Sequence, residues 1–192
     1  MYDLDMGYYE EHAKEYAEQS ANEPIREDHA RFLSMVPKGG LILDVGFGGA
    51  RSMLYFQKQG RHVCGIDTCE PFVERAASLG LEVKALDVLQ LEEREKYDGV
   101  WASASLLHLK KEDLPKAIDN IARALKNGGA FYCSFKYGDS EREEGGRHFT
   151  DLRDGTLLRD QFEILREDVS EDALGRGNRW LSLLCIKKTD EN

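Results

Sequence analysis

The segment Leu41-Ile42-Leu43-Asp44-Val45, followed at once by Gly46-Phe47-Gly48-Gly49, restricts the fold more than any other part of the chain. A continuous apolar run with one acid indicates a strand that is buried on both faces. The glycines end that strand and allow the backbone to approach a ligand closely, and residues 51–59 have a helical pattern. In an open α/β sheet, such a turn lies at the edge where ligands bind. We therefore expect a parallel sheet with a ligand site at this turn.

The rest of the chain alternates between strand-like and helix-like segments. Strands are expected at 41–45, 62–66, 81–86, 97–102, 130–135, 162–169 and 180–187. The helical patterns between the first five strands favour βαβ units. The last two strands have no helical pattern between them, which suits an antiparallel pair at the sheet edge. The sequence predicts an α/β fold with a doubly wound, seven-stranded, Rossmann-like sheet whose last strand is antiparallel, in a single domain over residues 1–192.

Helices are also expected outside the strand region. Apolar stripes predict a helix over residues 9–19 and a second that starts near Pro24 and ends before residues 37–40. Asp113 is placed to cap a later helix that ends at Asn127-Gly128-Gly129.

A polar stretch, residues 138–147, follows the fifth expected strand. Its acidic part, Glu141 to Glu144, is typical of a solvated loop. The alternative is a flexible lid, in which case Arg147, His148 and Phe149 would face a substrate.

The glycine-rich turn differs from two nucleotide-binding fingerprints. The dinucleotide pattern G-x-G-x-x-G/A needs a small residue at its third position, where this chain has Arg51. The phosphate-binding pattern G-x-x-x-x-G-K-[ST] is absent from the sequence. A nicotinamide-dependent oxidoreductase therefore remains an alternative that Arg51 disfavours.

The turn resembles the first motif of class I S-adenosylmethionine-dependent methyltransferases, acid-x-Gly-x-Gly-x-Gly. The chain has Asp44-x-Gly46-x-Gly48-x-Ala50, with alanine in place of the last glycine. Further likenesses follow in order along nearly the whole chain: Asp67 and Asp87 after the second and third strands, Tyr97 to Leu109 as the fourth strand and its loop, and Leu125 to Gly129 before the fifth. The chain is similar to the small-molecule, type 11-like methyltransferase domains.

This resemblance implies a Rossmann-like methyltransferase fold with S-adenosylmethionine as cofactor. In the family, the acid at Asp67 binds the ribose hydroxyls, and the acid at Asp87 contacts adenine beside Val88. The N-terminal segment, residues 1–37, is implied to form a helical cap over the cofactor site. The implied cofactor-binding residues are Asp44, Gly46, Phe47, Gly48, Asp67, Thr68, Asp87, Val88, Ser103 and Tyr16. No metal site is implied.

His108, after the fourth strand, is the candidate catalytic residue, and a structural or surface histidine is the alternative. Methyl transfer from a sulfonium needs a base only where the acceptor must lose a proton, a role that imidazole suits near neutral pH. Tyr9 and Tyr16 either close over the cofactor or pack their helix onto the core.

For the protein as a whole, we expect methyl transfer to a small molecule. The alternative is a protein that binds S-adenosylmethionine without catalysing methyl transfer, and only a measurement of turnover distinguishes the two.

Composition narrows the expected partners. The net charge of -10 is unlike that of proteins that bind nucleic acids through phosphates, so no nucleic-acid partner is expected. No apolar run approaches the ~18 residues of a membrane span, and the N-terminus lacks a signal-peptide pattern. The four cysteines lack zinc-ligand spacing and suit buried thiols in a reducing compartment. We expect a cytoplasmic protein with no membrane partner and leave its oligomeric state open.

Overall fold

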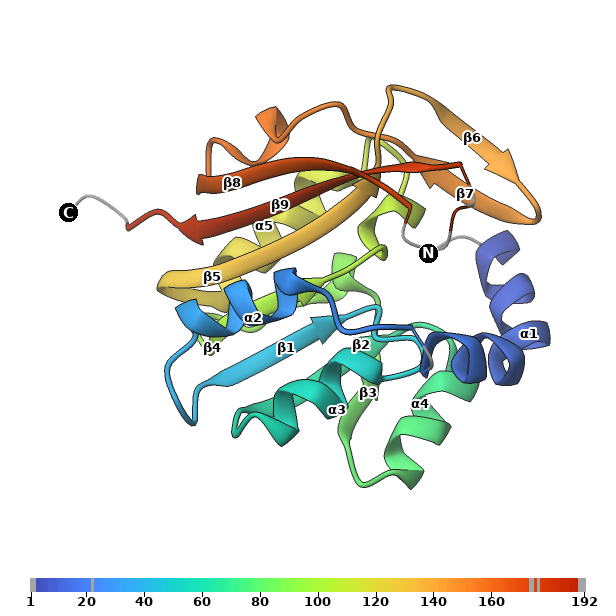
Figure 1. Ribbon diagram of the computed structural model, residues 1–192, viewed down its shortest axis with the longest axis horizontal. Helices are drawn as coiled ribbons and strands as arrows, with labels where there is room; N and C mark the ends of the chain where they lie inside the picture. Colours follow the sequence, from blue (N-terminus) through green and yellow to red (C-terminus); the bar gives the residue numbers. More distant parts are fainter. Residues whose placement is uncertain (1–2, 22, 173–174, 176, 190–192) are drawn as a thin grey trace.

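A seven-stranded sheet forms the centre of the computed structural model, which describes residues 3–21, 23–172, 175 and 177–189. Its strands are β1 (Leu41–Val45), β2 (His62–Asp67), β3 (Glu82–Ala85), β4 (Tyr97–Ala102), β5 (Leu125–Lys136), β8 (Phe162–Glu171) and β9 (Arg179–Lys187), in the order β3-β2-β1-β4-β5-β9-β8 (Figure 1). Strands β1 to β5 are parallel, and β9 is antiparallel to β5 and to β8. The doubly wound α/β fold with an antiparallel last strand is confirmed.

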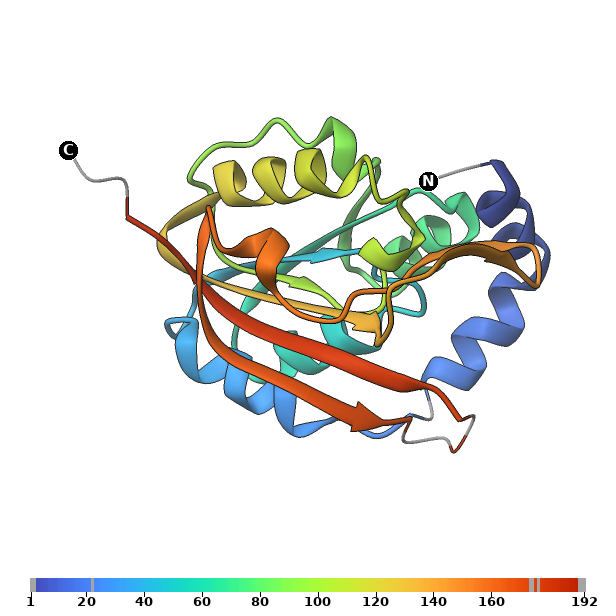
Figure 2. The same cartoon turned by 90° about the horizontal axis from the view of Figure 1, so that it is seen from above.

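In the described part of the chain, five α-helices cover this sheet and its carboxyl edge: α1 (Asp3–Ala21), α2 (Glu27–Met35), α3 (Arg51–Lys58), α4 (Glu70–Ser78) and α5 (Leu114–Ala124). Helix α5 covers one face, and α2 and α3 cover the other (Figure 2). The two faces alternate along β1, where Leu43 packs in the α5 core and Ile42 in the α2–α3 core. No helix among the described residues has both the length and the apolar character needed to cross a bilayer.

Three helices differ from the sequence prediction at their boundaries. Helix α1 covers Asp3–Ala21 and is longer at both ends than the expected 9–19. Helix α2 starts at Glu27, not near Pro24, because Arg26 has extended backbone angles (φ -87°, ψ 162°). Helix α5 ends at Ala124 and not at residues 127–129. Leu125 is already extended, pairs with β4, and accepts a hydrogen bond from Lys187 Nζ at 2.9 Å. Asp113 lies at the N-cap of α5, but its side chain makes no capping hydrogen bond.

The polar stretch after β5 is not the solvated loop that its charges predict. Strands β6 (Glu141–Glu144) and β7 (Arg147–Thr150) form a separate antiparallel hairpin beside α1 (Figure 1). A side-chain contact joins its two strands, with Glu143 Oε1 2.7 Å from His148 Nδ1. Thr150 Oγ1 donates to the Leu109 carbonyl at 2.7 Å, which fastens the hairpin to the loop after β4. Pairing and packing therefore order a segment that looks solvent-exposed in sequence.

Candidate functional site

The glycine-rich turn after β1 packs directly against the loop after β4. Gly46 has φ +67°, and its N–H donates to the Ile66 carbonyl at 2.8 Å. A Cβ at this position would lie 2.4 Å from the Cβ of Ser105. Both the positive φ and the close approach require glycine here, so the turn presents backbone rather than side chains.

Asp67 ends β2 and organises the neighbouring loops. Its Oδ2 accepts from Gly48 N–H and its Oδ1 from Cys69 N–H, each at 2.9 Å. Burial raises the pKa of this carboxyl, and these backbone donors act in the opposite direction. Because each carboxylate oxygen has two acceptor positions, Asp67 can hold its loops and still accept further hydrogen bonds.

Asp44 lies within β1, one residue before its end, and is only 3% exposed. Its Oδ2 is buried without a hydrogen-bond partner among the described residues. Burial, then the charge of Asp67, raises the pKa of Asp44 well above its usual value, and Arg51 acts in the opposite direction. A buried carboxyl oxygen without a partner is costly, so this position is suited to a ligand that brings a donor or a positive charge.

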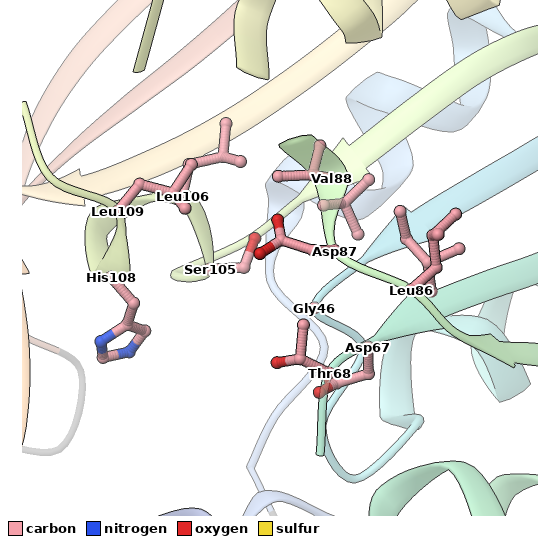
Figure 3. Close-up of a pocket in the computed structure, with 12 residues that line it drawn as sticks. Gly46, Asp67, Thr68, Leu86, Asp87, Val88, Ser105, Leu106, His108 and Leu109 are labelled. Carbon is pink, nitrogen blue, oxygen red and sulfur yellow. The ribbon is translucent and has the colours of Figure 1, made fainter. Parts of the chain in front are cut away.

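A narrow pocket lies at the ends of β1, β2 and β3. Asp67, Thr68, Asp87 and Val88 line one side, and the loop after β4 with its 3₁₀ turn η2 (Leu106–His108) lines the other (Figure 3). The Asp87 Oδ1 accepts from Leu89 N–H at 2.9 Å and so starts the 3₁₀ turn η1 (Val88–Gln90). Ser105 Oγ is buried with no hydrogen-bond partner in the described part of the chain. This pocket thus combines apolar walls with carboxylate and hydroxyl groups.

A larger cavity of about 640 Å³ adjoins this pocket, and Gly46 and His108 line both. Its wall includes Asp44, Phe47, Gly48, Ser103, Tyr9, Tyr16, Arg26, Lys136, Arg147 and Phe149. Every residue that the sequence resemblance implied for the cofactor lines one of the two spaces. Of the segment 1–37, helix α1 and the residues before α2 line the cavity, whereas Phe32 and Leu33 of α2 pack on the sheet.

His108 is buried at the boundary between the two spaces. Its Nδ1 lies 2.8 Å from the carbonyl oxygen of His148. Because a carbonyl only accepts, Nδ1 carries the hydrogen. In the neutral ring, Nε2 then accepts from the Tyr9 hydroxyl at 3.0 Å. The histidine is therefore joined to both α1 and β7.

Sequence reasoning missed Arg26 and Lys136 as wall residues. Lys136 is the last residue of β5, so the strand-end rule that selected Asp67 also applies to it. No comparable rule selects Arg26 from the sequence. It reaches the cavity wall through a hydrogen bond that its Nη2 donates to Ser103 Oγ at 3.1 Å. In the described ranges, no group of three or more His, Cys, Asp or Glu side chains is arranged to hold a metal ion.

Comparisons with known proteins agree with this geometry. A family model described as "Methyltransferase domain" matches residues 42–129. Phosphoethanolamine N-methyltransferase 1 of Zea mays is 24% identical over 84% of this chain, and the chain spans 36% of that enzyme's length. A tRNA (carboxymethyluridine(34)-5-O)-methyltransferase of Arabidopsis thaliana is 32% identical over 52% of the chain and 25% of its own length. The Burkholderia thailandensis 1,6-didemethyltoxoflavin-N1-methyltransferase has the same fold, with a TM-score of 0.81, 19% identity, and coverage of 96% of this chain and 87% of its own.

Proposed function

We propose that this chain, which contains a methyltransferase domain, is a class I S-adenosylmethionine-dependent methyltransferase that binds S-adenosylmethionine at the turn after β1 and transfers its methyl group to a small-molecule acceptor. The observation that carries the proposal is the buried Asp44 Oδ2 without a partner, beside the Asp67 carboxylate. A cofactor with one ammonium group and two ribose hydroxyls supplies the donors that these two side chains require.

The residues present fit this cofactor. Asp44 is suited to the ammonium group of its methionine part, and Asp67 to the ribose hydroxyls. Asp87 and Val88 are suited to the adenine, with the unpartnered Ser105 Oγ on the opposite wall as a further polar contact. When bound, S-adenosylmethionine supplies a methyl group on a positively charged sulfur, which is already an activated leaving group.

The protein's contribution to such a displacement is mainly orientation, which can lower a barrier by ~7–11 kcal/mol. Tyr16 contributes to it by covering the turn, since a Cβ on Gly48 would lie 3.1 Å from the Tyr16 ring. His108 can remove a proton from the acceptor only by way of Tyr9 or after Tyr9 moves, because the Tyr9 hydroxyl occupies its Nε2. In the relay, Tyr9 accepts the acceptor's proton while its own hydroxyl proton passes to His108.

The walls of the cavity support a small acceptor. Helix α1 and the β6–β7 hairpin both contribute to its wall, so an acceptor bound there would lie between these two elements. The net charge of -10 also disfavours a polyanionic substrate. Because some relatives are named as tRNA methyltransferases, tRNA is the competing acceptor class that an assay must include.

Calorimetry with S-adenosylmethionine, S-adenosylhomocysteine and NAD tests the proposal. We expect micromolar binding of the first two and none of NAD. Turnover, followed as S-adenosylhomocysteine release with panels of small molecules and with bulk tRNA, then separates an enzyme from a non-catalytic binding protein. Binding of NAD alone would exclude the methyltransferase assignment, and turnover only with tRNA would exclude the small-molecule assignment.

A further inference from the structure

Four cations line the large cavity: Arg26, Arg51, Lys136 and Arg147. Three of them have polar partners. Arg51 Nη1 lies 3.1 Å from Glu23 Oε2, Arg26 binds Ser103, and Lys136 Nζ is 3.6 Å from Glu144. Arg147 has neither an ion pair nor a hydrogen bond from its side chain to any described residue. The guanidinium of Arg147 is partly buried on the cavity wall, where a ligand that carries an oxyanion can pair with it.

Aromatic rings hold Arg147 in place. Its Cζ lies 4.5 Å from the centroid of Tyr8 in α1 and 5.2 Å from that of Phe149. Its Nε is buried and has no partner within the described structure. The faces of these rings attract the guanidinium charge, and the planar N–H fork of an arginine matches carboxylate or phosphate oxygens. Arg147 is thus held among aromatic rings, and no described residue accepts a hydrogen bond from its Nε.

Lys136 provides a second positive charge at the same ring. Its Nζ lies 3.7 Å from the centroid of Phe149. Burial lowers the pKa of Lys136, and the charge of Glu144 opposes that effect. Glu144 lies closer to Arg142, at 3.1 Å, than to Lys136, so Lys136 is only partly neutralised.

We propose that Arg147 and Lys136 form an oxyanion subsite for the acceptor, and that the acceptor carries a carboxylate or phosphate group. This inference rests on the proposed function, because it names the class of molecule that receives the methyl group. The subsite lies in the same cavity as His108, whose ring centroid is 5.1 Å from that of Phe149. It is formed by β5 and β7 rather than by the strands assigned to the nucleoside.

Anion titrations of the S-adenosylhomocysteine complex test this subsite. Inorganic phosphate and acetate, added at constant ionic strength, represent the two oxyanion classes, and calorimetry measures their affinities. We expect Arg147→Met to weaken binding of the preferred anion by about 10-fold or more. Arg147→Lys, which keeps the charge but loses the fork, should give a smaller loss.

Arg142→Met is the matched control. Arg142 also packs on Phe149, at 5.4 Å, but Asp151 and Glu144 neutralise it, and it does not line the cavity. Because Arg142→Met also frees Glu144 to pair with Lys136, we expect a loss of anion affinity that is much smaller than in Arg147→Met. Equal anion affinity in wild type and Arg147→Met, or no anion binding by the wild type, would overturn the proposal.

Cofactor affinity separates this inference from the proposed function. A loss of S-adenosylhomocysteine binding in folded Arg147→Met would place the cofactor's own carboxylate at Arg147 and overturn the acceptor subsite. The anion titrations are also repeated without S-adenosylhomocysteine, to cover the case in which the protein does not bind this compound. If the wild type fails to bind S-adenosylhomocysteine but still binds phosphate through Arg147, the methyltransferase proposal fails and an anion site remains.

Discussion

The Tyr9 hydroxyl lies 3.0 Å from Nε2 of His108, and this contact joins α1 to the loop after β4 across 99 positions of sequence. The opposite ring nitrogen faces the His148 carbonyl in the hairpin. One imidazole therefore connects three separate parts of the cavity wall.

Tyr9→Phe tests the relay, because it keeps the ring contacts of Tyr9 and removes the hydroxyl. With an acceptor that must lose a proton, we expect turnover to fall by about 10²-fold, while S-adenosylhomocysteine affinity stays nearly constant. Tyr8→Phe is the control, since Tyr8 contacts Arg147 through its ring. Equal turnover in Tyr9→Phe and wild type would exclude the relay. Both variants are assayed by S-adenosylhomocysteine release.

Asp67→Asn tests the ribose assignment. The substitution replaces one carboxylate oxygen with a donor and should weaken S-adenosylhomocysteine binding about 10-fold, measured by calorimetry. Asp98→Asn is the control. Asp98 accepts from Leu41 N–H at 2.8 Å, at the amino end of β1 and away from the pocket, so its loss should lower stability and leave affinity unchanged. A folded Asp67→Asn protein with wild-type affinity would disprove the assignment.

Cofactor affinity should depend on the protonation of Asp44. Burial raises the pKa of this carboxyl in the free protein, whereas a bound ammonium group favours the ionised form. Affinity for S-adenosylhomocysteine should therefore fall with decreasing pH below that raised pKa, by up to about 10-fold per pH unit, and be constant above it. Calorimetry across acidic to neutral pH should show this slope in wild type and a weak, pH-independent affinity in Asp44→Asn. The same pH dependence of affinity in wild type and Asp44→Asn would show that a group other than Asp44 takes up the proton.

Gly46→Ala should destabilise the protein for two separable reasons. The left-handed backbone costs a non-glycine residue about 1–2 kcal/mol, and the new Cβ would lie 2.4 Å from that of Ser105. Ser105→Gly removes the second cause only. In chemical denaturation, the double variant should be more stable than the sum of the single effects by about 1 kcal/mol. If the effects of the two single substitutions on the free energy of unfolding are additive, the loops after β1 and β4 move apart without a cost in stability.

His29 should make stability depend on pH. It is fully buried against Trp101 and Ser52, and burial lowers its pKa from 6.5 to about 3. Because the folded state keeps the ring neutral, its contribution is complete above pH 6.5 and is lost as pH falls toward 3. Between pH ~7.5 and ~5, the free energy of unfolding should fall by about 2 kcal/mol from this group. Denaturation of His29→Phe should lack this component, whereas the exposed-site control His62→Gln should retain it.

The sequence predicted the carboxyl edge of the sheet well because parallel strands end there together. Three acids that are far apart in the chain each lie at or near a strand end: Asp44, Asp67 and Asp87. Because ligands of open α/β sheets bind at the carboxyl ends of the strands, this one rule places all three acids at the same site. Ala50 at the last motif position has φ 63°, so the backbone conformation expected of glycine is kept even though the residue is not glycine.

The acceptor side could not be predicted in the same way. The alternating charges of Glu141 to Glu144 contain no apolar pattern, and the hairpin depends on the cross-strand pairs and on the burial of Phe149. Arg147 and Lys136 belong to different strands of different sheets. Their approach to a common ring follows from tertiary packing, which local patterns do not encode.

The β6–β7 hairpin leaves the main body of the protein and returns to it at one place. Tyr137 and Leu152 form a bridge at its base, and Gly138 N–H donates to the Leu152 carbonyl at 3.1 Å. The intervening segment is thus a module with adjoining ends, and neither of its strands pairs with the seven-stranded sheet. Insertions, deletions or recombination there would replace one wall of the large cavity and leave the turn after β1 intact. A hairpin graft is therefore a route by which protein engineering could change that wall alone.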